Sequence, residues 1–197
     1  MYPYQEPGGH GYQGPEASDN AYQHNGDNTY RHNGDIYNNS NSVTAMQHQI
    51  SLFSSWSQEK RDHHLLLAAA DGQHRRLELL LQAHADVDYH DETGKTALHL
   101  AALGNYDQCI ELLVRYGAYI NAEDYQGATA LHDAAGSGLH STVEMLLNQG
   151  AKIDAEDHHG YTALMYAMRG GQEPSDGHEM TVKLLHYRGA TMDWNQS

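Results

Sequence analysis

Hydrophobic positions divide the chain near residue 43. Residues 1–42 contain almost no aliphatic side chain beyond Met1 and Ile36, whereas Leu, Ile, Val and Ala recur in dense clusters from Leu65 onward. Within these clusters the apolar positions follow the three- and four-residue steps of helices. The pattern predicts a polar tail joined to a folded module of short amphipathic helices.

A separate apolar stripe joins the two parts. Val43, Met46, Ile50 and Phe53 recur at three- and four-residue steps, and Trp56 follows three residues later. This spacing predicts a helix with one apolar face. Two interpretations stay open: a cap laid over the start of the folded module, or a detachable helix that binds a groove on a partner.

The folded module repeats with a period of 33 residues. DETGKTALHLAA begins at Asp91, DYQGATALHDAA at Asp124 and DHHGYTALMYAM at Asp157, and each block is followed by an apolar helical pattern that ends in Gly-Ala. Moving back one period finds LLLAAADGQHRRLELLLQAHADVD, which carries alanine, glycine and leucine at matching places. A fixed period of this length is typical of stacked repeats, so we expect four copies of a helix-turn-helix unit.

Punctuating residues recur at fixed places in each unit. A hydroxyl side chain can cap the first helix at Thr96, Thr129 and Thr162. The turn between the helices needs a left-handed backbone, which suits Gly72, Asn105, Gly138 and Gly171. A glycine closes the second helix at Gly117, Gly150 and Gly189, with His84 in that place in the first copy.

The sequence G-x-T-A-L-H-x-A-A followed by L-L-x-x-G-A-x-[IV]-[ND] resembles the ankyrin repeat. The resemblance implies an all-α solenoid of stacked helix-turn-helix units with short hairpin loops, whose usual task is protein binding. We therefore expect a disordered tail over residues 1–42, a helical linker or cap over 43–59, and an ankyrin-repeat domain over 60–193. The expected repeats cover residues 60–90, 91–123, 124–156 and 157–193.

Several positions depart from the family pattern. Alanine replaces the usual proline of the T-P-L-H signature, and Met165 replaces its histidine in the last copy. The last copy also has six extra residues between its helices, near Gln172 to Gly177, which form a candidate additional contact. The resemblance also implies that Asn121 occupies a place that is hydroxylated in some animal ankyrin repeats, and that His99 and His132 form structural hydrogen bonds.

Charge narrows the choice of partner. The formal net charge is −15, and residues 1–60, with two basic and six acidic residues, and 61–197, with nine and twenty, are both acidic. Nucleic acids and anionic membranes draw on Lys and Arg for binding, so we expect neither as a partner. The single cysteine and a first segment, MYPYQEPGGHGYQ, without a basic start or apolar stretch favour an intracellular protein of the cytoplasm or nucleus.

The residues predict no catalysis, no metal and no cofactor. Neither a nucleophile with its base nor a phosphate-binding glycine loop is present, and the adjacent pairs His63-His64 and His158-His159 are badly spaced for one zinc site. Cys109 lies at an apolar position of a second helix, where packing is a more natural role than reactivity. We therefore expect a non-catalytic protein.

The resemblance implies that the protein binds, masks or recruits a protein partner through its hairpin tips and the exposed faces of its first helices, because stacking leaves these places free. By position, the candidate contacts are Glu92, Thr93, Lys95, Tyr125, Gln126, Ala128, His158, His159 and Tyr161 in the hairpins, with Leu103, Ser137 and Arg169 on the helices. Tyrosine is frequent among energetically important interface residues, which favours Tyr125 and Tyr161. Acidic residues beside them favour a partner with a basic patch.

An alternative function is assembly or condensation through the tail. Tyrosines are scattered through residues 1–42, and the echo YQHNGD from Tyr22 and YRHNGD from Tyr30 repeats them in a polar sequence. Spaced aromatic residues in such sequences form weak attractive contacts. Phosphotyrosine docking and a purely solubilising role also remain open, and the sequence leaves the oligomeric state undetermined.

Overall fold

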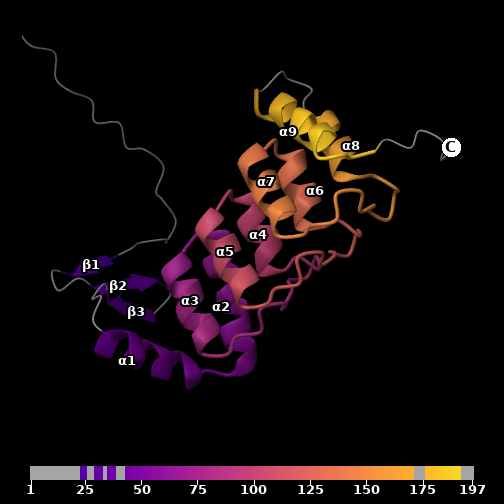
Figure 1. Cartoon of the computed structure of the whole chain (residues 1–197). Coiled ribbons are helices and arrows are strands. Elements are labelled where there is room, and N and C mark those ends of the chain that lie inside the picture. The colour runs from indigo at the N-terminus through magenta and orange to yellow at the C-terminus, as the bar shows by residue number, and fades with distance from the viewer. Residues whose placement is uncertain (1–22, 26–28, 33–34, 39–42, 171–175, 192–197) are drawn as a thin grey trace, which may run out of the picture. The chain divides into compact units, whose positions relative to one another are not determined.

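A computed structural model describes residues 23–25, 29–32, 35–38, 43–170 and 176–191. The chain divides into two compact units, residues 1–45 and 46–197, and each is described by itself. Three short strands lie in the first unit, and the helices that follow α1 lie in the second (Figure 1).

The described part of the second unit contains four helix pairs, and the prediction of an all-α repeat solenoid is confirmed. The pairs are α2 (Gln58–Ala70) with α3 (His74–Gln82), α4 (Ala97–Leu103) with α5 (Asp107–Arg115), α6 (Ala130–Gly136) with α7 (His140–Asn148), and α8 (Ala163–Gly170) with α9 (Asp176–Tyr187). The first helices pack in the series α2, α4, α6, α8, and the second helices lie behind them (Figure 1). We call these two rows the inner and outer helices.

The core is a continuous layer between the inner and outer helices. Pairs of alanines on the inner helices are fully buried, which lets neighbouring inner helices approach closely, as Ala101, Ala102, Ala134 and Ala135 show. Leucines of the outer helices fill the space behind them, and Leu80, Leu113, Leu146 and Leu185 are all 0% exposed. Stacking therefore shelters apolar surface that a single helix pair would leave in water.

The turns between helices have the left-handed backbone that their glycine and asparagine residues predict. Gly72, Asn105 and Gly138 adopt φ values of 67°, 58° and 69° at the turns between helices, as predicted. Asn105 also accepts a 2.6 Å hydrogen bond at Oδ1 from the Thr142 hydroxyl of the next repeat. The side chain that replaces glycine thus links two repeats. Gly171, predicted for the fourth turn, lies outside the described residues.

The end of the joining helix is tied to the first repeat. Phe53 in the last turn of helix α1 (Val43–Ser54) is 1% exposed. The Trp56 ring lies 4.8 Å from the Phe53 ring and 4.7 Å from that of His64 in α2. Arg61 of α2 donates a 2.6 Å hydrogen bond to the Trp56 carbonyl. These contacts support the cap interpretation for the C-terminal end of this helix.

The tail contains a short antiparallel sheet that the sequence analysis did not foresee. Strands β1 (Gln23–Asn25), β2 (Thr29–His32) and β3 (Asp35–Asn38) pair in that order, and His32 lies opposite Asp35. Two residues, Asn33 and Gly34, therefore join β2 to β3, and Asn-Gly is the sequence that most strongly favours a two-residue hairpin. The remainder of residues 1–42 lies outside the described residues, and disorder there stays a prediction.

Candidate functional site

Three hairpins project between the helix pairs, and each is organised by one aspartate. Oδ1 of Asp91 accepts hydrogen bonds from the backbone N–H groups of Thr93 at 2.8 Å and Lys95 at 3.0 Å. Asp124 and Asp157 repeat this arrangement one and two periods later. Burial raises the pKa of each carboxyl, but hydrogen bonds from neighbouring side chains and from these backbone N–H groups lower it by more, so the net pKa is below the usual 3.8. The D-x-x-G motif thus fixes the shape of each tip.

The hairpins also bind one another. Gly94 has φ 85°, and a Cβ there would lie 2.6 Å from both the backbone nitrogen and the ring of Tyr125. The Tyr125 N–H donates to the Thr93 carbonyl at 3.1 Å, and the His158 N–H donates to the Gln126 carbonyl at 2.8 Å. Glycine is therefore required where successive tips approach, and the tips form a connected surface.

Two buried histidines connect the inner helices to the hairpins, as the family resemblance implied. Nδ1 of His99 accepts from the Thr96 N–H at 3.2 Å, so Nε2 carries the proton and donates to the Ala128 carbonyl at 3.1 Å. His132 forms the same bridge from the Thr129 N–H to the Tyr161 carbonyl. The fourth repeat has Met165 at this position, and Thr162 Oγ1 is left buried without a hydrogen-bond partner among the described residues.

We expect acid to destabilise the repeats through these two histidines. Burial lowers the pKa of His99 and His132 below 6.5, so both are neutral when folded, and the unfolded chain binds protons first as pH falls. Their stabilising effect is complete above pH 6.5 and is lost below it. Urea unfolding at pH 7.5 and 5.5 should show a smaller loss of stability for His99→Gln/His132→Gln than for the unaltered chain.

The control for this measurement is His140→Gln/His186→Gln, which alters two exposed histidines of the outer helices. This variant should keep the pH dependence of the unaltered chain. An equal pH dependence in both double variants would contradict the role assigned to the buried pair.

Lys95 forms a buried ion cluster rather than a free contact at the tip. Its Nζ lies 3.0 Å from Asp124 Oδ2 and 2.8 Å from Asp133 Oδ2. Burial lowers the Lys95 pKa, but the hydrogen bonds and charges of Asp133 and Asp124 raise it more, so the lysine stays charged. Only 21% of the Lys95 side chain is exposed, and the cluster joins the second repeat to the third. The ammonium of Lys95 is therefore engaged within the stack rather than free at the hairpin tip.

The prediction that Ala128 contacts a partner is corrected by the structure. The family position suggested an exposed hairpin contact, but the residue is 4% exposed, and its carbonyl receives the His99 hydrogen bond. The place lies at the base of the hairpin, against the preceding repeat, and its small side chain cannot reach a partner.

The remaining candidate contacts are exposed, as a docking surface requires. They are Glu92, Thr93, Tyr125, Gln126, His158, His159, Tyr161, Leu103, Ser137 and Arg169. Tyr125 has the largest exposure among the aromatic hairpin residues, at 61%, and its hydroxyl lies 3.3 Å from His90 Nδ1. Counting one period from Leu103 gives Gly136 rather than Ser137, so Ser137 lies one residue beyond the matching place and caps α6.

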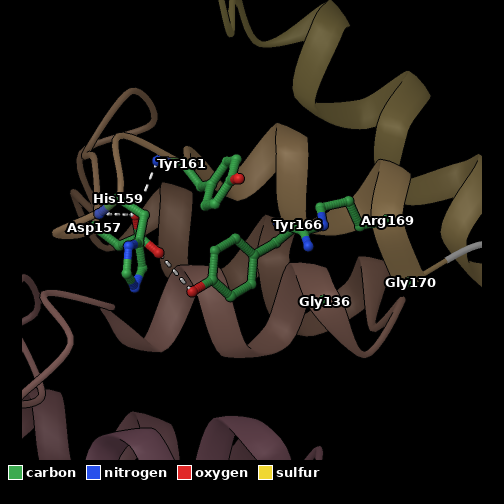
Figure 2. Close-up of a pocket in the computed structure, with 7 residues that line it drawn as sticks. All are labelled: Gly136, Asp157, His159, Tyr161, Tyr166, Arg169 and Gly170. Atoms are coloured by element: carbon green, nitrogen blue, oxygen red, sulfur yellow. Dashed lines mark hydrogen bonds between the residues drawn. The ribbon is translucent and has the colours of Figure 1, made fainter.

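The sequence analysis missed a hollow at the last interface, which lies between the third and fourth repeats. It has a volume of about 420 Å³ and is lined by Gly136, Asp157, His159, Tyr161, Tyr166, Arg169 and Gly170. Figure 2 shows Tyr166 and Arg169 reaching into it from α8, with Tyr161 from the hairpin before that helix. The sequence signal for this hollow was Gly136, because the matching positions of the preceding and following repeats carry the long side chains of Leu103 and Arg169.

The surroundings of Cys109 and the histidines bear on whether these side chains could react or bind a metal. Cys109 is 0% exposed in α5, and burial raises its thiol pKa to about 11, which suits packing rather than a nucleophile. Among the described residues, no group of three His, Cys, Asp or Glu side chains converges as metal ligands. In the same part of the chain, no helix has the length and apolar character needed to cross a membrane.

Asn121 has a structural partner. Its Oδ1 accepts a 2.7 Å hydrogen bond from the Lys152 N–H, and Asp88 and Asp154 accept equivalent bonds from Tyr119 and Thr191. The side chain therefore links adjacent repeats, and modification of Asn121 stays a prediction.

The stacked helix pairs and projecting hairpins define a repeat solenoid. Residues 65–157 and 126–196 match the family model described as "Ankyrin repeats (3 copies)", and the chain belongs to the ankyrin-repeat family. None of the curated proteins compared with the chain matches it. Ankyrin repeats are generally non-catalytic protein-binding modules, which makes the surface of tips and inner helices the candidate functional site.

Proposed function

We propose that this protein binds a protein partner with a basic patch through its hairpin tips and inner helices, and masks or recruits that partner. The exposure of Tyr125 on a connected row of tips is the observation that most supports this function. Tyrosine offers a large contact area with few rotatable bonds, so little conformational entropy is lost when it is covered.

The charge on this surface supports a basic partner. Glu92, Glu123 and Glu156 are exposed on the hairpins, and none of them forms an ion pair within the described part of the chain. The hairpin cation Lys95, by contrast, is already neutralised by Asp124 and Asp133. Complementary charge speeds association and selects partners, so binding should weaken as salt is raised.

Replacing both exposed hairpin tyrosines is expected to weaken binding. Tyr125→Ala/Tyr161→Ala should lower the affinity for partners captured from cell extract by about 2 kcal/mol or more, because the anchors of the surface are removed. Titration of each captured partner against both chains measures the change, and thermal melts should show nearly unchanged folding.

The matched control is Tyr116→Ala/Tyr187→Ala, which removes two exposed tyrosines from the ends of the outer helices. Partners that bind this control and the hairpin variant equally well do not use the tips. If every captured partner behaves in that way, the proposed surface is wrong.

The alternative, assembly through the tail, stays a prediction of the sequence. Nothing among the described residues favours it over protein binding, because the described part of the tail is confined to the small sheet β1–β3.

A further inference from the structure

The hollow at the last interface differs from the corresponding place between the second and third repeats. Leu103, Gly136 and Arg169 occupy one position in three successive repeats, so α6 contributes no side chain there. A Cβ on Gly136 would lie 3.2 Å from Cδ1 of Tyr166 and would begin to fill the space. The lack of a side chain at Gly136, opposite the Tyr166 ring, therefore leaves this space open.

The negative charge in the hollow is already satisfied. Asp157 is 6% exposed, its Oδ1 accepts two backbone hydrogen bonds, and its Oδ2 accepts a 2.8 Å hydrogen bond from the Tyr166 hydroxyl (Figure 2). Burial and this hydrogen bond raise the Tyr166 pKa to about 12, so the hydroxyl stays protonated and keeps donating. Asp157 therefore has little capacity left for a ligand.

The positive charge is not satisfied in the same way. The Arg169 guanidinium is exposed and lies 4.7 Å over the Tyr161 ring, and it forms no ion pair within the described residues. One interface earlier, the cation Lys95 is held between Asp124 and Asp133. Tyr166 occupies the position of Asp133 one period later, so the hollow lacks the second carboxylate.

We propose that this hollow is a subsite for an aspartate or glutamate side chain of the protein partner. The inference rests on the proposed function and adds an acidic residue to a partner that is otherwise basic along the tips. The Arg169 guanidinium lies over the Tyr161 ring, and a planar guanidinium can pair with a carboxylate through two parallel hydrogen bonds. The rings of Tyr161 and Tyr166 pack against the methylene groups of the incoming side chain.

The hollow suits a singly charged anion better than a phosphate. It extends along α8, from Asp157, His159 and Tyr161 before the helix to Arg169 and Gly170 at its end, and it supplies one guanidinium. A phosphate near pH 7 carries close to two negative charges and is usually held by several donors. One carboxylate matches this arrangement more closely.

Peptide selection with the full chain tests the proposal. A library of random twelve-residue peptides displayed on phage is selected on the unaltered protein, Arg169→Gln, Gly136→Leu and Arg115→Gln. Arg115 is an exposed arginine in the last turn of α5, so its replacement removes the same charge from an outer helix. Gly136→Leu places the side chain of the matching residue Leu103 into the hollow.

Peptides selected on the unaltered chain and on Arg115→Gln should share an aspartate or glutamate at one position, and this preference should disappear with Arg169→Gln and Gly136→Leu. A selected peptide remade with glutamine at that position should bind about tenfold more weakly, the usual effect of removing a charged hydrogen-bond partner. Thermal melts establish that each variant is folded, and Arg169→Gln alone decides the test if Gly136→Leu unfolds.

Each contrary result has a distinct meaning. Selected peptides without a shared acidic position, or with one that survives Arg169→Gln, overturn the subsite and leave the binding function standing. Tighter binding of the peptide remade with phosphoserine overturns the assignment to a carboxylate. If the unaltered chain selects no peptide at all, both the subsite and binding of short segments by this surface are wrong.

Discussion

Leu113→Ala is expected to lower the free energy of unfolding by about 2 to 5 kcal/mol. Leu113 is 0% exposed in α5, in the layer between the inner and outer helices. Truncation removes its buried methyl groups and leaves a cavity that close-packed neighbours can only partly fill. Urea unfolding followed by circular dichroism measures the loss.

The matched control is Leu103→Ala, the same substitution at a residue that is 40% exposed on α4. This change should cost less than about 1 kcal/mol, because little burial is lost at a surface position. Equal losses in the two variants would mean that the outer-helix leucines do not form the core described above.

The form of the transition carries a second test of the stack. Each repeat contacts only its neighbours, so a defect at Leu113 weakens the interfaces on both sides of the second repeat. A broadened or two-step transition in Leu113→Ala, with a smaller m-value, would show that one end of the stack unfolds before the other.

The sequence predicted those parts of the fold that depend on local chemistry. The inner helices α4, α6 and α8 begin directly after Thr96, Thr129 and Thr162, the predicted cap positions, although the Thr162 hydroxyl makes no capping hydrogen bond among the described residues. The positive φ values at Asn105 and at the glycines likewise follow from which residues tolerate a left-handed backbone. Because these local signals recur every 33 residues, they are not a chance match to the repeat pattern.

The candidate site was only partly predictable, because it depends on pairs of residues that meet across repeats. Lys95 contacts Asp124 and Asp133, which lie 29 and 38 residues away, and no local pattern marks that pairing. Lys95 and Ala128 were both expected to contact a partner because they occupy matching hairpin positions. The period fixes the place of the backbone, but the size and charge of each side chain decide what it contacts.

The same reason explains the missed hollow and the missed sheet. The hollow requires Gly136 of one helix to face Tyr166 of the next, which becomes visible only when α6 and α8 are packed together. The β2–β3 pairing was hidden by the low apolar content of residues 1–42, although Asn33-Gly34 is a hairpin signal that depends on turn geometry rather than burial. Composition therefore described the tail on average and gave no sign of this strand pairing.

Lys95→Met is expected to lower the free energy of unfolding by about 3 kcal/mol, because removing one partner of a buried ion cluster leaves the others uncompensated. The side chains of Asp124 and Asp133 are 5% and 12% exposed, so water cannot easily replace the lost ammonium. Urea unfolding at pH 7 measures the effect.

The double variant Lys95→Met/Asp133→Leu tests whether the loss of stability comes from the unpaired carboxylate left on Asp133 or from the lost ion pairs of Lys95. Leucine is the residue at the matching position 100, and Asp124 keeps its two backbone hydrogen bonds to Gln126 and Ala128. Replacing a buried ion pair with apolar side chains is often close to neutral, so the double variant should recover to within about 1 kcal/mol of the unaltered chain. If it is no more stable than Lys95→Met, the unpaired charge of Asp133 is not the source of the lost unfolding free energy. Recovery would show that the cluster tolerates apolar replacement, and that stacking itself, rather than this ion pairing, holds the second and third repeats together.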